Sequence, residues 1–121
     1  MRKVTLEVAS REAVNRRFRN ALAGKAQGTR LSFESPALLI KVLSGRRWDL
    51  LKVMTGAGPM TIREAARRME RDVKGVHADV HTLLAAGVLR KTDDGRIVFP
   101  YDAIRVDAAS RVMEIDDVFV A

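Results

Sequence analysis

The sequence contains no cysteine, which excludes disulfide bonds and metal sites built on thiolates. Only 5% of its residues are aromatic, so there is little material for stacking on the bases of single-stranded RNA. No apolar run approaches the roughly 20 residues that a membrane-spanning helix needs. The first residues also lack the apolar core of a signal peptide. We therefore expect a soluble, cytoplasmic protein with no membrane partner.

Positive charge is what this chain has in excess. Its 121 residues include 22 Lys and Arg against 15 Asp and Glu, for a formal net charge of +7. The excess lies mainly in residues 1–60, whereas residues 101–121 are net acidic. A hydrophobic content of 47% is enough for one compact core. The charge favours a polyanionic partner.

The pattern of the N-terminal third predicts a strand, a helix and a second strand. Polar and apolar residues alternate over residues 4–8 and again over residues 30–34. Between them, from the potential cap Ser10 to Leu22, apolar residues recur at helical spacing. We assign residues 1–34 to a strand-helix-strand arm that serves as a dimerisation element.

Two further helices are predicted next. Ser35-Pro36 is a strong helix start, and the buried face of this helix is expected to hold Leu38, Leu39, Val42 and Leu43. Ser44-Gly45 separates it from a second helix, whose apolar face is expected to hold Trp48, Leu51, Val53 and Met54.

The central segment predicts a helix, a tight turn, a longer helix and a hairpin. Thr61 and Glu64 form a capping box at the start of the first helix. The second helix runs from its cap Asp72 to Gly87. Two strands, 88–91 and 96–99, then meet around Asp94-Gly95. Residues 104–106 suggest an additional edge strand.

These elements predict an α+β fold, mainly α: a winged helix-turn-helix with an N-terminal strand-helix arm. The winged helix-turn-helix occupies residues 35–107. Residues 108–121 form a tail for dimer or partner contacts, because it is too apolar for an ordinary solvated end.

The helix after Asp72 is the candidate recognition helix. Its apolar stripe is expected to centre near Val73, Val80 and Leu84. The face turned towards the DNA major groove is then predicted to present Arg71, Lys74, Gly75, Ala78, His81 and Thr82. Lys74 reaches a guanine edge or a phosphate, while the small Gly75 and Ala78 allow close approach. The alternative is an ordinary solvated polar face.

Other basic residues are candidates for contacts with the DNA backbone. The predicted backbone contacts are Thr61, Arg63, Arg67, Arg46 and Arg47. The predicted wing contacts are Arg90, Lys91 and Arg96. Alternatives stay open: Arg67 pairs with Glu64 or Glu70, Arg46 and Arg47 cap an apolar cluster, and the acidic hairpin tip turns away from DNA.

Nothing in the sequence indicates catalysis. His77 and His81 have the spacing of metal ligands on a helix, but a site needs further ligands, and we expect a half-buried His77 instead. No nucleophile elbow, phosphate loop or catalytic pair of carboxylates occurs. We predict neither an enzyme, nor a cofactor, nor a metal site.

Several segments resemble a group of small prokaryotic winged-helix DNA-binding proteins, related in fold to MarR-like and ArsR-like regulators. The resemblance is carried by Gly58–Arg67, Val76–Val80, Leu84–Leu89, Pro100–Asp102, residues 5–20 and Leu31–Ser35. It implies that Lys74 and its neighbours lie on the recognition helix. Members often have larger polar residues in place of Gly75 and Ala78. Similar small proteins serve as transcriptional regulators or as antitoxins.

We therefore expect a sequence-specific, double-stranded DNA-binding transcriptional regulator that acts as a dimeric (auto)repressor and associates with the nucleoid when bound. The alternative is an antitoxin-type interaction module that binds a toxin protein through its C-terminal tail.

Overall fold

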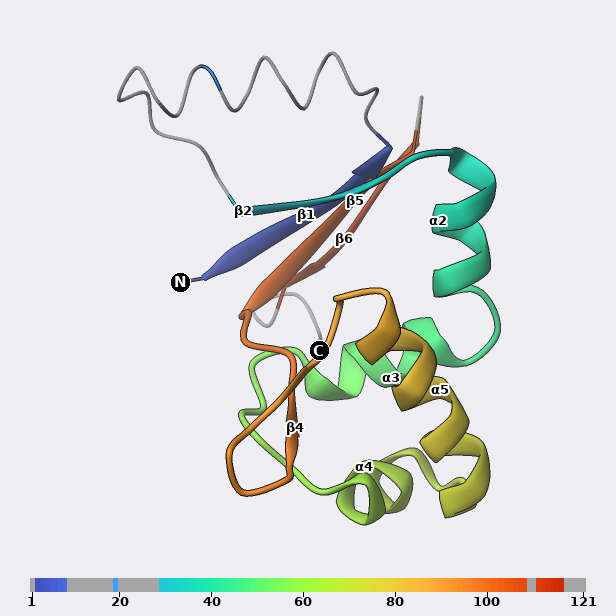
Figure 1. Cartoon of the computed structure of the whole chain (residues 1–121), viewed down its shortest axis with the longest axis vertical. Coiled ribbons are helices and arrows are strands. Elements are labelled where there is room, and N and C mark those ends of the chain that lie inside the picture. Colours follow the sequence, from blue (N-terminus) through green and yellow to red (C-terminus); the bar gives the residue numbers. More distant parts are fainter. Residues whose placement is uncertain (1, 9–18, 20–28, 109–110, 117–121) are drawn as a thin grey trace.

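The computed structural model describes residues 2–8, 19, 29–108 and 111–116. These residues form an α+β fold, as the sequence predicts. A four-stranded sheet occupies the upper half of Figure 1, with helix α2 (Pro36–Leu43) beside it, and the later helices with a short hairpin occupy the lower half. The helix predicted after Ser10 and the loop that follows it lie outside the described residues. No helix within the described ranges is long and apolar enough to cross a bilayer.

The sheet brings together both ends of the described chain. Its strand order is β2-β1-β5-β6, with bounds β1 Lys3–Val8, β2 Thr29–Phe33, β5 Ala103–Ala108 and β6 Arg111–Asp116. β1 runs parallel to both of its neighbours, and β6 is antiparallel to β5. The strand predicted at residues 104–106 is therefore confirmed, but its edge position is wrong, because β5 lies between β1 and β6.

One face of the sheet is apolar, as the alternating pattern predicts. Val4 pairs in register with Ile104 and Leu6 with Val106, and all four side chains are buried. On a polar position of β1, the carboxylate of Glu7 accepts a hydrogen bond from Arg30 Nη1 at 2.7 Å. The sheet therefore packs its core on the face that carries Leu6.

Helix α2 (Pro36–Leu43) begins where the sequence predicts. The Ser35 hydroxyl oxygen accepts a hydrogen bond from the Leu38 N–H at 3.1 Å, and proline occupies the first turn. The buried side chains are Leu39, Val42 and Leu43. Leu38, which was expected to face inward, is 41% exposed. The buried face is thus narrower than the apolar pattern.

Helix α3 (Arg47–Met54) follows a break at Gly45, whose φ of +67° suits glycine. It buries Leu50, Leu51 and Met54, while Trp48 and Val53 are only partly buried. The predicted buried face is therefore confirmed at Leu51 and Met54, whereas the pattern did not identify the buried Leu50.

The two helices and the two short strands predicted for the central segment form where the sequence predicts them. Thr61 caps α4 (Ile62–Met69), because its Oγ1 accepts a hydrogen bond from the Glu64 N–H. Asp72 caps α5 (Val73–Ala85) in the same way, because its carboxylate accepts from the Gly75 N–H. β3 (Arg90–Lys91) and β4 (Ile97–Val98) are antiparallel. Gly95 between them has a φ of +83°.

The sheet and the helices share one hydrophobic cluster. All three predicted segments, 1–34, 35–107 and 108–121, contribute strands to the same sheet. A backbone hydrogen bond joins the two halves, because the Gly56 N–H after α3 donates to the Tyr101 carbonyl before β5 at 2.9 Å. At the paired starts of β1 and β5, the Asp102 N–H donates to the Arg2 carbonyl at 2.7 Å. The position of the helices relative to the sheet is therefore fixed by packing as well as by chain connection.

The turn between α4 and α5 generates a stability prediction. Glu70 has a φ of +54°, in the left-handed region that favours glycine. We expect Glu70→Gly to leave the free energy of unfolding unchanged or raise it by up to about 1 kcal/mol, because backbone strain is relieved. The matched control is Gly87→Ala at φ +78°, which should lower it by about 1 kcal/mol. Urea unfolding measures both, and an equal loss in the two variants would contradict strain at Glu70.

Candidate nucleic-acid interface

The inner face of α5 is set by Val76, Val80 and Leu83, none of which is exposed. The expected centre near Val73, Val80 and Leu84 is confirmed at Val80 and wrong at the other two positions, because Val73 is 41% exposed and Leu84 is only partly buried. The apolar residues of α5 cover a wider arc of the helix than the part that packs against α3 and α4. The spacing of apolar residues along one helix does not show where the neighbouring helices lie, so it could not predict which part of the arc is buried.

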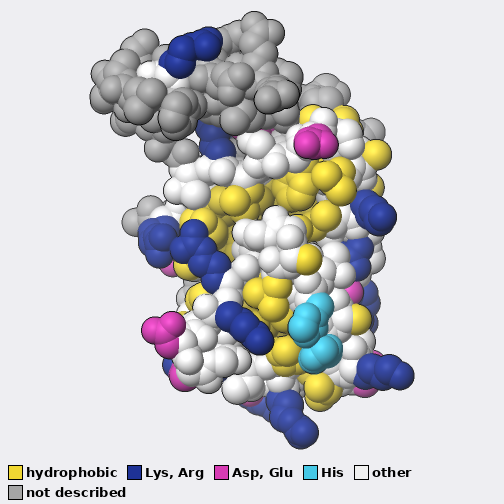
Figure 2. All heavy atoms as spheres, in the orientation of Figure 1, with side chains coloured by type: hydrophobic (Ala, Val, Ile, Leu, Met, Phe, Trp, Pro, Cys, Tyr) yellow, Lys and Arg dark blue, Asp and Glu magenta, His cyan; other side chains and the backbone are white. Residues whose placement is uncertain are grey.

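The outward face of α5 carries four of the six predicted recognition residues. Lys74, Ala78, His81 and Thr82 are exposed. The Thr82 hydroxyl donates to the Ala78 carbonyl at 3.2 Å, so its proton is directed at the helix backbone. His77 is exposed as well, which corrects the expectation of a half-buried side chain. Both histidines lie on the surface in Figure 2.

The other two predicted recognition residues, Arg71 and Gly75, serve the protein itself. Arg71 is only 16% exposed, and its Nη1 donates to Asp79 Oδ2 at 2.7 Å. A Cβ atom at Gly75 would lie 3.1 Å from Arg71 Nη2, which is closer than nine in ten real contacts of a Cβ atom. The missing side chain at position 75 therefore makes room for the guanidinium that reaches Asp79.

Asp79 is a residue that the sequence reasoning did not identify. Its carboxylate is 14% exposed and accepts from Arg47 Nη1 at 3.3 Å as well as from Arg71. The same Arg47 guanidinium donates to the carbonyls of Lys41 and Val42 at the end of α2, each at 2.5 Å. Asp79 thus joins the end of α2, the start of α3 and the turn before α5. Its partners are 8 and 32 positions away, so no local spacing indicates them.

One of the predicted contacts on α4, Arg67, is engaged in an ion pair. Glu64 accepts from Arg67 at 2.5 Å and from Arg68 at 2.9 Å, which confirms the alternative that Arg67 pairs with Glu64. These bonds, first from Arg67 and then from Arg68, lower the pKa of Glu64 to about 2. Its carboxylate is thereby directed at the arginines. The predicted capping box is therefore confirmed only in its Thr61 half, in which Thr61 Oγ1 accepts from the Glu64 N–H.

The three cations of the hairpin differ in whether they are paired with a carboxylate. Arg90 and Lys91 are exposed on β3. Arg96 instead donates to Asp94 at 2.8 Å, and the pKa of Asp94 is lowered by hydrogen bonds from the Thr92 hydroxyl and from Arg96. The charge of Arg96 is therefore partly neutralised at the hairpin tip.

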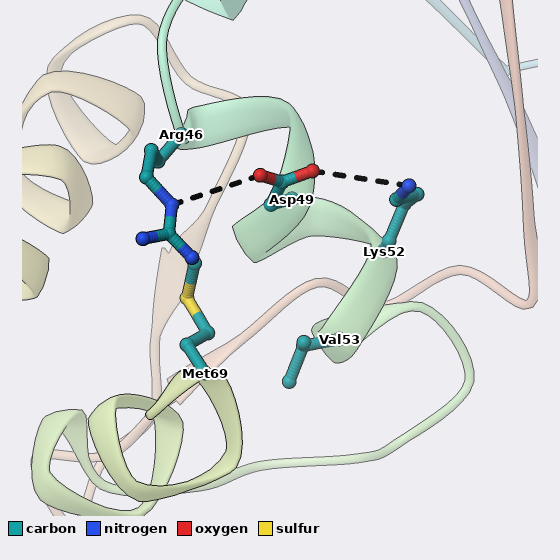
Figure 3. A pocket seen from close by; sticks show the side chains of 5 residues that line it. All are labelled: Arg46, Asp49, Lys52, Val53 and Met69. Atoms are coloured by element: carbon teal, nitrogen blue, oxygen red, sulfur yellow. Dashed lines mark ion pairs between the residues drawn. The ribbon is translucent and has the colours of Figure 1, made fainter. Parts of the chain in front are cut away.

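Arg46 lines a shallow pocket of about 400 Å³ beside α3 and α4 (Figure 3). Its Nε lies 3.7 Å from Asp49, which also pairs with Lys52 at 3.8 Å. Val53 and Met69 give the pocket an apolar lining. Asp49 therefore offsets the charge at this pocket.

The remaining cations of the predicted interface are exposed and form no ion pair with any residue that the structure describes. They are Arg63, Lys74, Arg90 and Lys91. Figure 2 shows separate Lys and Arg side chains around the lower half of the molecule, where the helices and the hairpin lie. These four residues carry the charge that is available to an external partner.

A family model described as HVO_A0114 matches residues 42–106. The matched segment extends from the end of α2 into β5 and includes the whole candidate interface. No curated protein and no solved structure matches the chain.

The position of α5 is expected to depend on Asp79. Asp79→Ala leaves two mostly buried arginines without their shared partner, so we expect the free energy of unfolding to fall by about 2–3 kcal/mol. The control is Asp49→Ala, which also removes a carboxylate bonded to two cations, but one that is 49% exposed. That change should cost less than about 1 kcal/mol. Urea unfolding compares the two variants, and equal losses would show that Asp79 does not hold α5.

Proposed function

The chain belongs to the HVO_A0114 family, and we propose that it is a double-stranded DNA-binding transcriptional regulator that acts as a homodimer. In this proposal the segment from α3 to β4 is a winged helix-turn-helix. α5 is the recognition helix, and the β3–β4 hairpin is the wing.

The order of the elements supports the proposal. α4 and α5 pack against each other across a turn at residues 70–72, and α3 packs against both helices. The β3–β4 hairpin follows α5 after a break at Gly87 and is joined to the start of the motif by a bridge between Met60 and Ile97. A helix, a short turn, a second helix and a hairpin in this order are typical of DNA-binding domains that place the second helix in the major groove.

The outward face of α5 is the observation on which the proposal rests. This face carries Lys74 beside the small Ala78, and the one acidic residue of the helix, Asp79, is held by arginines on another side. A helix that enters the major groove lies close to phosphates, so an exposed carboxylate on this face would oppose binding. The arrangement therefore suits a polyanion, and the exposed Arg90 and Lys91 on the hairpin extend the positive charge.

The sparse side chains on α5 suit a limited direct readout. Lys74 can contact a guanine or a phosphate, Ala78 a thymine methyl group, and Thr82 offers its hydroxyl oxygen as an acceptor. We propose that contacts of Arg63, Arg90 and Lys91 with the DNA backbone, together with DNA shape, supply much of the affinity.

One recognition helix reads half a site, so a dimer is needed for a full operator. The proposed operator lies upstream of the protein's own coding region, which makes the protein an autorepressor.

The alternative function, capture of a toxin protein by residues 108–121, has less support. β6 uses residues 111–116 of this segment to pair with β5 over six register positions. This pairing supports a role of the segment in completing the protein's own sheet.

The test is an anisotropy titration with a labelled duplex taken from the upstream region. Lys74→Ala should weaken binding by about 1–2 kcal/mol, roughly five- to thirtyfold, because it removes a base or phosphate contact at the centre of the interface. A phosphate contact also lowers the salt slope by about 1, whereas a base contact relaxes sequence preference at one position.

The matched control is Lys52→Ala, which removes the same charge from an exposed lysine paired with Asp49 on α3. Its affinity should stay within about twofold of the wild type, because a charge outside the interface is screened by salt. Equal losses in the two variants would exclude α5 as the reading element. A chain that binds no duplex at all would overturn the proposed function.

A further inference from the structure

His77 and His81 present two imidazole nitrogens to the same point in space. They occupy adjacent turns of α5, with ring centroids 4.2 Å apart and the two Nε2 atoms separated by 3.1 Å. Both side chains are exposed, and Figure 2 shows them together on an open part of the surface. The chain has no other histidine. The Nε2 atoms therefore meet at a position that solvent ions can reach.

The separation of these nitrogens fits a shared metal ion. With Zn–N bonds of about 2.0–2.1 Å, two nitrogens on one ion lie about 2.9–3.4 Å apart for bond angles between about 90° and 110°. In the absence of an ion, one Nε2–H donates to the other Nε2. Both rings bind a metal when each is neutral and carries its proton on Nδ1. The ion then takes the place of the shared proton.

We propose that His77 and His81 form a two-histidine chelate for a divalent transition-metal ion such as Ni²⁺, Zn²⁺ or Cu²⁺. Imidazole nitrogen suits these ions, whereas Mg²⁺ and Ca²⁺ prefer oxygen ligands. Among the described residues, no cluster of three or more His, Asp or Glu could hold a metal. Asp79 lies between the two histidines in sequence but is bonded to Arg47 and Arg71. Water or a second molecule therefore completes the coordination, and the site is exchangeable.

The site has a regulatory consequence that rests on the proposed function. His81 is exposed on the same helix as Lys74, and an ion with its waters extends beyond the imidazole rings. The major groove, about 12 Å wide, is nearly filled by a helix about 10–12 Å across. A hydrated ion at this position blocks close docking of α5, so metal binding and DNA binding oppose each other, and linkage makes the effect reciprocal.

The site is tested by calorimetric titration of the untagged full-length chain with NiCl₂ or ZnSO₄, without DNA. We expect one ion per chain. His81→Gln combined with Thr82→His keeps two histidines but places them five residues apart, on different sides of the helix, and should weaken binding at least about tenfold. His77→Gln combined with Ala85→His restores the four-residue spacing one turn later, at another exposed position, and should recover binding.

The outcomes separate the site from the proposed function. Circular dichroism verifies that each variant is folded, as expected for substitutions at exposed positions. Equal metal affinity in the wild type and the five-residue-spacing variant would overturn the chelate, and so would failure of the Ala85→His variant to recover binding. In a second arm, Ni²⁺ should weaken binding of the wild type to duplex DNA, whereas the affinity of the His77→Gln variant for the same duplex should be equal with and without Ni²⁺. Metal binding without this effect keeps the site and removes its link to DNA.

Discussion

The carboxylate of Asp79 is the interaction on which the candidate interface depends. It is 14% exposed and binds two arginines, Arg47 and Arg71, one of which also holds the final carbonyls of α2. Attraction between opposite charges is stronger in such partly buried surroundings than at the surface. Three elements are thereby locked to one side of α5. The opposite side, with Lys74, is left to face outward.

Charge is distributed in the structure in a way that the sequence total does not reveal. A net charge of +7 favours a polyanionic partner but does not say which cations would meet it. On α4 and at the hairpin tip, Glu64 and Asp94 engage arginines that the sequence placed at the interface. Some arginines thus form ion pairs within the protein, whereas others face solvent. The positive charge that is available to a partner is therefore smaller and more localised than the composition indicates.

The sequence predicted those features of the fold that depend on neighbouring residues. Caps at Ser35, Thr61 and Asp72 appear where the pattern placed them, because each cap bonds an N–H three residues further on. Alternation in β1 correctly identified its buried face. Sheet order could not be predicted in this way, since β1 pairs with residues about 100 positions away and periodicity does not name a partner strand.

The same limit explains the errors at the candidate site. Lys74 and Ala78 were placed outward correctly, because they lie opposite the buried Val76 and Val80 on an isolated helix. Arg71 and Val73 were misplaced, because their exposure is decided by distant residues: Asp79 draws Arg71 inward, and Val73 lies outside the arc that is buried against α3 and α4. The helical pattern therefore predicts the centre of the exposed face, whereas tertiary contacts decide whether the residues at its borders are buried or exposed.

A dimer that binds DNA is constrained by this arrangement. A subunit interface formed on the outward face of α5 would cover Lys74, so dimerisation has to use another surface. Helix α2 lies beside the sheet, away from the hairpin, and exposes two large apolar side chains, Leu38 at 41% and Ile40 at 62%. The outer strands of the described sheet, β2 and β6, offer further surfaces on the sheet. Since the sheet and helices share one core, a dimer formed through any of these surfaces would hold two α5 helices at a fixed separation, as readout of a two-fold operator requires.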